Sequence, residues 1–153
     1  MPNHVFNVLE ITGDKKELKR FREENAGEYP DEKGKKHKIA LSFDKLIPQP
    51  AVFSDNEKPV SKKFSMPRWY IWRLRNWGTK WNCYEIEIKH TARKLIYRFQ
   101  TAWSPPEAWL AEIAMCYPAL KFQMCFEEEG NNYPKGTFKV QNNKFKELKG
   151  CRM

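Results

Sequence analysis

The densest group of side chains with binding chemistry lies between residues 69 and 82, in the stretch WYIWRLRNWGTKWN. Four of the six tryptophans stand here beside arginine and lysine residues. Aromatic rings beside cations can stack on nucleic-acid bases, hold a cation over a ring face, or pack together to fix a loop. The candidate binding residues of this tryptophan-rich segment are Arg73, Arg75, Asn76, Trp77, Lys80 and Trp81.

Two interpretations of this segment remain open. In the first, the turn Gly78-Thr79-Lys80 presents backbone amides and a lysine to a phosphate or carboxylate, with Arg73 as a bidentate donor. In the second, the tryptophans pack over an otherwise uncovered sheet face, and Asn76 or backbone carbonyls accept hydrogen bonds from the indole N–H groups. The packed arrangement is preferred, and the cations could still be presented to a partner.

The sequence contains no recognisable catalytic constellation. His4, His37 and His90 fall in separate predicted elements, and none stands beside a Cys, Ser or acid in a nucleophile pattern. Removal of Met1 would expose the amine of Pro2, as in tautomerase-like enzymes, but proline at this position is common for processing reasons. We therefore expect a protein that is not an enzyme, with no cofactor and no metal site.

The four cysteines form no Cys-x-x-Cys pair and have no histidine at zinc-ligand spacing; they are Cys83, Cys116, Cys125 and Cys151. This spacing predicts four free thiols in a reducing compartment. The N-terminus lacks a secretion signal, and no window approaches a membrane-spanning length of apolar residues. The expected location is the cytoplasm, with no membrane partner.

The net charge is +9 at pH 7, and the excess is concentrated in residues 58–98, where Glu85 and Glu87 are the only acids. A basic excess in one segment suggests a polyanionic or acidic partner at that surface. The alternative is a solvated face that keeps the protein soluble. The sequence favours neither over the other.

Hydrophobic periodicity predicts the elements that position the tryptophan-rich segment. The expected strands lie at 4–11, 38–43, 82–89, 94–101 and 120–127, and the expected helices at 14–26 and 105–116. The pairs Asp14 with Glu17 and Ser104 with Glu107 have the spacing of helix-capping boxes. In the hairpin that follows the segment, the expected register places Glu85 opposite Arg98.

The length predicts a single domain over residues 1–153, with an insertion at about 44–81 and a short C-terminal edge hairpin at about 130–150. The lysines of that hairpin are expected to discourage edge pairing. Residues 28–38 mix many charges with Pro30 and Gly34, which is typical of a mobile loop.

The element order predicts an α+β fold: a ferredoxin-like split βαβ arrangement, with an antiparallel sheet, both helices on one face and the tryptophan-rich segment inserted. The strand order separates Cys83 from Cys125, so these two thiols should not bridge. The other sheet face would offer Phe6, whereas Tyr97 and Phe99 are assigned to the helix face. Base stacking on that open face therefore has weak support.

Five ordered motifs resemble the YubB-type ferredoxin-like domain family of bacteriophage, plasmid and other mobile-element proteins. They are PNHVFNVLEITGD, FDKLIP, NWGTKWN, TAWSPP and FEEEG, and they run from Pro2 to about Gly136. The resemblance implies the ferredoxin-like fold and a mobile-element setting, with the cytoplasm of a bacterial host as the location. It supplies no catalytic residues.

Two function classes follow from these observations. In the first, a non-enzymatic accessory protein of a phage or other mobile element binds nucleic acid or a nucleoprotein through a basic, tryptophan-rich surface. In the second, a protein-binding module inhibits or decoys a host defence factor. The sequence does not decide between a nucleic-acid partner and a host-protein partner, and it does not indicate an oligomeric state.

Overall fold

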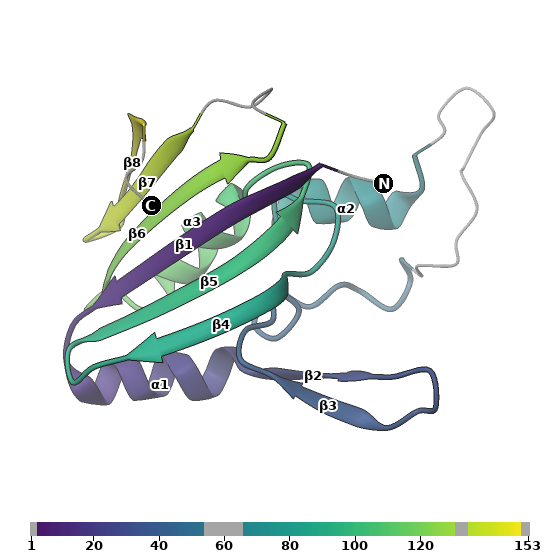
Figure 1. The fold of residues 1–153 in the computed structure, drawn as a ribbon, viewed down its shortest axis with the longest axis horizontal. Coiled ribbons are helices and arrows are strands. Elements are labelled where there is room, and N and C mark those ends of the chain that lie inside the picture. The colour runs from purple at the N-terminus through teal and green to yellow at the C-terminus, as the bar shows by residue number, and fades with distance from the viewer. Residues whose placement is uncertain (1–2, 54–65, 131–134, 151–153) are drawn as a thin grey trace.

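The computed structural model describes residues 3–53, 66–130 and 135–150. Figure 1 shows how the helices and strands of these residues are arranged. In chain order they are β1 (His4–Thr12), α1 (Lys15–Asn25), β2 (Gly27–Pro30), β3 (Lys36–Ile39), α2 (Arg68–Asn76), β4 (Tyr84–His90), β5 (Lys94–Ala102), α3 (Glu107–Met115), β6 (Lys121–Glu128), β7 (Gly136–Gln141) and β8 (Lys144–Lys149). None of the helices in this described part is long and apolar enough to cross a bilayer.

Six strands form one antiparallel sheet in the order β4-β5-β1-β6-β7-β8 (Figure 1). Strand β1 lies inside the sheet, paired with β5 on one side and with β6 on the other. The order β4-β5-β1-β6 is that of the split βαβ unit, so the predicted ferredoxin-like α+β fold is confirmed. Strands β7 and β8 extend the sheet beyond β6, which makes it larger than a simple split βαβ sheet.

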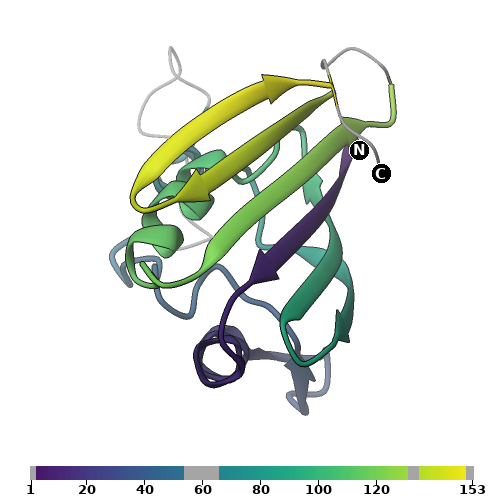
Figure 2. The same ribbon diagram turned by 90° about the vertical axis from the view of Figure 1, so that its left-hand side faces the viewer.

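Helices α1 and α3 cover the same face of the sheet, as Figure 2 shows. Because successive side chains of a strand point to opposite faces, Val5, Leu9 and Ile11 of β1 all point toward these helices and are fully buried. The helices contribute the buried side chains Leu18, Phe21, Trp109, Leu110 and Ile113 to the same core. In the described part of the chain no helix covers the opposite face, which we call the open face (Figure 2).

The two helices covering the sheet begin without the predicted capping bonds. Asp14 is the N-cap residue of α1, but its side chain makes no capping hydrogen bond. The N-cap residue of α3 is Pro106 and not the predicted Ser104. The hydroxyl of Ser104 donates instead to the carbonyl of Gly78, at 2.6 Å. This serine therefore fastens the tryptophan-rich segment to the start of α3.

The hairpin of β4 and β5 has a different register from the predicted one. Glu87, and not Glu85, stands opposite Arg98. The shift occurs at an irregularity between Tyr84 and Glu87, where Glu85 has a φ of +51°. Such a bulge adds residues to one strand only, which alternation of residue types does not reveal.

Residues 28–38, predicted as a mobile loop, lie almost entirely within the β2–β3 hairpin and its turn. The carboxylate of Asp31 accepts hydrogen bonds from the amides of Lys33 and Lys35 at 2.9 and 2.8 Å. Asp31 also lies 2.8 Å from His37, whose ring stacks on Tyr29. The loop prediction was wrong, because the charged composition of this stretch does not reveal the tight turn that Asp31 closes.

The chain after β3 leaves regular structure earlier than predicted. The expected strand 38–43 ends at Ile39, and the residues beyond it supply buried side chains without strand pairing. Leu41 and Phe43 are both fully buried, and the Phe43 ring lies 4.8 Å from that of Trp109 on α3. This segment therefore forms part of the core on the helix side of the sheet.

The cysteines of the described residues, Cys83, Cys116 and Cys125, are thiols. Cys83 is buried, its sulfur lies 3.3 Å from the carbonyl oxygen of Leu41, and burial raises the pKa of its thiol. Cys116 is exposed at the end of α3. Cys151 lies outside the described residues.

We expect an alkylating reagent to modify Cys116 rapidly in the native protein and Cys83 only after unfolding, because a buried thiol with a raised pKa provides little thiolate. Peptide mapping by mass spectrometry after timed alkylation measures both rates. Unfolded protein kept without reductant should yield four thiols. Equal rates at Cys83 and Cys116 in the native protein would contradict the burial.

Candidate functional site

Trp77, the central residue of the tryptophan-rich segment, is a core residue. Only 2% of its surface is exposed, and its ring packs against those of Trp72 and Phe43 at 5.4 and 6.0 Å. Its indole N–H donates to the carbonyl of Ile47 at 2.9 Å. Because Phe43 and Trp109 belong to the helix side, the expected packing over the open face is wrong: this ring is buried on the opposite side.

Arg73 is held inside the same cluster. Its guanidinium lies 4.6 Å from the ring centre of Trp69 and 5.2 Å from that of Trp77. Its Nε donates to the Gln49 side chain at 2.6 Å, and its Nη1 donates to the carbonyl of Lys80 at 3.4 Å. These contacts tie α2 to the loops on either side of it, so Arg73 fixes the segment rather than extending from it.

Of the three turn amides in the first interpretation, that of Gly78 is already used within the protein. The amides of Trp77 and Gly78 both donate to the carbonyl of Arg73, at 2.7 and 3.0 Å. The hydroxyl of Thr79 donates to the carbonyl of Ala102 at 2.8 Å, and the side-chain amide of Asn76 donates to Trp72. These groups hold the loop against the end of β5.

Three of the six predicted site residues reach the surface and make no side-chain hydrogen bond among the described residues. Arg75 is exposed, Lys80 is partly buried with its ammonium 5.3 Å from the Tyr70 ring, and Trp81 is 37% exposed. Trp81 lies at the edge of the sheet, because its ring is 6.5 Å from that of Tyr84 on β4. The structure therefore separates Arg75, Lys80 and Trp81, as surface residues, from Arg73, Asn76 and Trp77, which stabilise the loop.

The register of the strands sorts the side chains of the open face into rows that cross the sheet. One row runs through Tyr84, Gln100, Phe6 and Glu127, and the next through Glu87, Arg98, Val8 and Cys125. Two more rows follow toward the β4–β5 turn. The first carries Lys89, Ile96, Glu10, Gln123, Lys139 and Lys146, and the second carries Lys94, Thr12, Lys121, Gln141 and Lys144.

The last two rows form the largest group of like charges on the open face. We call their six lysines the lysine rows: Lys89, Lys94, Lys121, Lys139, Lys144 and Lys146. Lys94 is partly buried and the others are exposed. Within the described ranges, the only ion pair of these lysines joins Lys94 to Glu10, at 3.9 Å. The lysine rows therefore present a strong positive field to solvent.

The opposite end of the open face is aromatic. Phe6 is 38% exposed on the inner strand β1. Beside it the His4 Nδ1 and the Tyr84 hydroxyl are 2.6 Å apart, and Trp81 approaches the Tyr84 ring from the edge of the sheet. Burial, and secondarily the charge of Glu129, raises the pKa of Tyr84, so its hydroxyl stays protonated at neutral pH.

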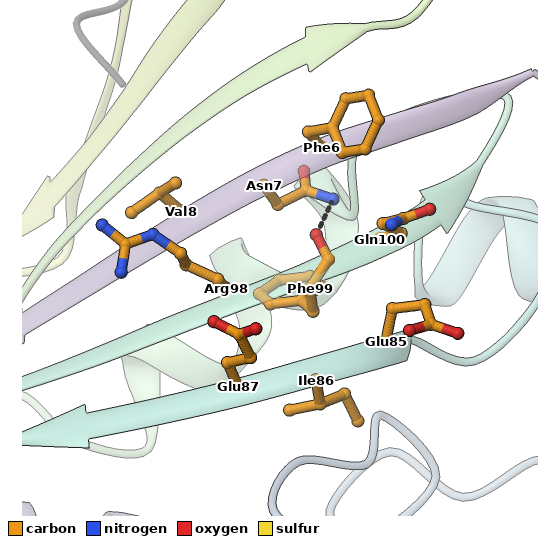
Figure 3. A pocket seen from close by; sticks show the side chains of 9 residues that line it. All are labelled: Phe6, Asn7, Val8, Glu85, Ile86, Glu87, Arg98, Phe99 and Gln100. Atoms are coloured by element: carbon orange, nitrogen blue, oxygen red, sulfur yellow. Dashed lines mark hydrogen bonds between the residues drawn. The ribbon is translucent and has the colours of Figure 1, made fainter.

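A hollow of about 610 Å³ opens between the aromatic end and the lysine rows. Figure 3 shows the side chains that line it, chiefly Phe6, Val8, Glu85, Glu87, Arg98 and Gln100. The Phe6 ring stands above β1, and the guanidinium of Arg98 reaches across from β5 toward Val8. The hollow thus combines one ring with donors and acceptors of hydrogen bonds.

The histidines form no site together. His4 lies on β1, His37 on β3 and His90 at the end of β4. His4 contacts Tyr84 and His37 contacts Asp31, so each has its own partner. Among the described residues no cluster of histidine, cysteine and acidic side chains is placed to hold a metal ion. Pro2, the residue of the tautomerase comparison, lies outside the described residues.

Sequence reasoning missed the contribution of the C-terminal strands to this surface. The basic residues of 58–98 divide between the α2 region and the β4–β5 hairpin, and Lys58, Lys62 and Lys63 lie outside the described residues. The lysine rows instead draw four of their six members from β7, β8 and the start of β6. The i, i+2 spacing of Lys144 and Lys146 was the available signal, because it places both on one face of a strand.

Comparison with known proteins agrees with the fold. Residues 77–149 match a family model described as a ferredoxin-like domain in Api92-like protein. The crystal structure of the protein api92 from Yersinia pseudotuberculosis is similar, with a TM-score of 0.56 and 13% sequence identity over 76% of this chain. The likeness covers 43% of the api92 chain, so this chain spans less than half the length of that protein. No curated protein matches.

The match begins at Trp77 and continues to the end of β8, so it includes the hairpin that extends the sheet. At 13% identity the similarity to api92 shows a shared fold and nothing about activity. The family model and the resemblance seen in the sequence both indicate a ferredoxin-like domain. The comparisons name neither the YubB type nor a phage or plasmid setting.

Proposed function

We propose that this protein is a non-enzymatic accessory protein that binds nucleic acid, and that it holds the sugar-phosphate backbone on the open face of its sheet. The observation that carries the proposal is the lysine rows. Six lysines from five of the six strands of the sheet lie on the open face, which no helix of the described residues covers, with Glu10 as their only acidic neighbour in the same rows.

The arrangement suits a polyanion better than a single anion. Phosphates of a nucleic acid repeat along a backbone, and lysine ammonium groups contact them without a fixed geometry. The five exposed lysines of the rows keep their charges in water until a ligand arrives, so binding would release condensed counterions. Arg75, Lys80 and Trp81 remain candidate contacts of the tryptophan-rich segment, with Trp81 beside Tyr84 at the aromatic end of the open face.

The biological setting is also part of the proposal. The resemblance to YubB-type domains supports a protein of a phage or other mobile element that acts in the cytoplasm of its bacterial host. In that setting the ligand would be nucleic acid or a nucleoprotein. The alternative partner is an acidic host protein, which the same lysines could bind through charge complementarity.

The salt dependence of binding tests the proposal. We expect Lys121→Ala and Lys139→Ala each to lower the slope of log affinity against log salt by about 0.7 to 0.9, because each variant loses one phosphate contact. Fluorescence anisotropy with labelled single-stranded and double-stranded DNA and RNA, over a series of salt concentrations, measures the slope. Affinity should fall by a similar factor for all base sequences.

Lys16→Ala is the matched control, because Lys16 is exposed on α1, on the far side of the sheet, and its loss changes the net charge equally. An unchanged slope in this variant separates a local contact from a general charge effect. If wild-type protein binds none of the four nucleic acids at low salt, the proposal fails. The lysine rows would then be assigned to a protein partner, for which capture of one host polypeptide is the assay.

A further inference from the structure

We infer that the hollow beside Phe6 takes one unpaired nucleobase, and that the nucleic acid bound on the open face is therefore single-stranded. The inference rests on the proposed function and adds the class of ligand. It is carried by three observations: an exposed ring on an inner strand, polar groups around it without partners, and the position of the lysine rows relative to that ring.

The exposed ring is that of Phe6. Large apolar side chains on an inner strand are usually covered, yet Phe6 is 38% exposed while its neighbours Val5 and Asn7 are buried. Strand β1 is paired along both edges, and Phe6 stands opposite Gln100 of β5 on one side and Glu127 of β6 on the other. The ring is thus carried by a rigid part of the sheet, which suits a stacking platform.

Three polar side chains of the hollow have no side-chain partner among the described residues. Among the described residues, Glu87, Arg98 and Gln100 take part in no side-chain hydrogen bond or ion pair, although Glu87 and Arg98 stand opposite each other. The edge of a nucleobase carries both donors and acceptors, so a site for it needs both. A carboxylate, a guanidinium and an amide beside one ring provide them.

A duplex could use the lysine rows but not this ring. Bases in a duplex are stacked on each other, whereas unpaired bases can turn out and stack on an aromatic side chain. Along β1 the nearer lysine row crosses at Glu10, four residues from Phe6, or roughly 13 Å at the rise of a strand. A backbone leaving the hollow therefore reaches the lysines within a few nucleotides.

Binding of matched single-stranded and duplex oligonucleotides tests the inference. We expect wild-type protein to bind the single strand more tightly than the duplex. We expect Phe6→Ala to weaken single-strand binding by about 5-fold to 150-fold, which corresponds to the loss of one stacked base. Its affinity for duplex and its salt slope should not change, because Phe6 contacts no phosphate. Phe6→Trp, which restores a ring, should recover most of the affinity.

Phe145→Ala is the control for loss of an exposed ring, since Phe145 is 37% exposed on β8 and faces the helix side. Thermal unfolding of Phe6→Ala should match the wild type and so exclude a folding defect. Equal affinity for single strand and duplex, or an unchanged single-strand affinity in Phe6→Ala, overturns the inference and leaves the proposed function standing. Absence of all binding at low salt overturns both.

Discussion

Replacing Trp77 by alanine should lower the free energy of unfolding by about 3–5 kcal/mol, the range for a large aromatic residue removed from a core. The ring is 2% exposed and contacts Phe43 and Trp72. The change would also leave the Ile47 carbonyl without its indole donor and remove one of the two rings that face Arg73. Urea unfolding followed by circular dichroism measures the loss.

Trp81→Ala is the matched comparison, because it removes the same side chain from the same loop. Trp81 is 37% exposed, and its ring contacts Tyr84 and the ammonium of Lys80. Its loss should cost no more than about 1.5 kcal/mol. Similar losses in the two variants would show that the division of the tryptophan-rich segment into core and surface residues is wrong.

Gly78→Ala should destabilise the protein by about 2–5 kcal/mol, although it adds a single methyl group. Gly78 has a φ of +83°, which residues with a Cβ atom rarely adopt. An added Cβ would lie 3.0 Å from the backbone nitrogens of Glu107 and Ala108 and 3.3 Å from the carbonyl oxygen of Pro105. These atoms start α3 and cannot move as a side chain would.

Gly34→Ala separates the cost of a positive φ from the cost of crowding against α3. Gly34, in the turn between β2 and β3, has nearly the same φ of +81°, but no atom lies within 4 Å of an added Cβ. This variant should cost only the backbone contribution, about 1–2 kcal/mol. Thermal and urea unfolding of both variants, measured together, give the difference. If Gly34→Ala costs as much as Gly78→Ala, crowding against α3 contributes nothing.

The sheet and its two covering helices could be predicted because each element has its own periodicity. Strand β1 alternates as Val5, Leu9 and Ile11 on the buried face, and α3 repeats Leu110 and Ile113 at helical spacing. Rules for strand connection then leave few arrangements. The bulge at Glu85 could not be predicted, because it depends on local backbone geometry that residue types do not specify.

The position of the tryptophan-rich segment could not be predicted from the sequence for a different reason. A large aromatic ring gains similar free energy against any apolar surface, so its burial can be expected while its location cannot. Trp77 packs against Phe43 and donates to Ile47, both in the segment after β3, and Phe43 in turn packs against Trp109 of α3. Only the assembled core brings them together.

The lysine rows could not be predicted from the sequence, because the register of strand pairing decides which lysines share a surface. Lys89 on β4 and Lys146 on β8 are far apart in the chain and share a row only through five successive strand pairings. A count of charge along the sequence groups Lys89 with Arg73, which the structure places in a different cluster. Charge per segment therefore did not identify this surface, because Lys121, Lys139, Lys144 and Lys146 lie outside the segment with the largest excess.

The inner position of β1 also constrains when the protein can fold during its synthesis. This strand is made before both of its partners, which are residues 94–102 and 121–128. At a translation rate of about 5–20 residues per second, the ribosome needs roughly 6 to 25 seconds to reach the last of these partners. Until then Val5, Leu9 and Ile11 have no sheet to join, and closing such long loops makes folding slow. The nascent chain therefore carries an unprotected apolar strand during this interval, in which a chaperone would act on it.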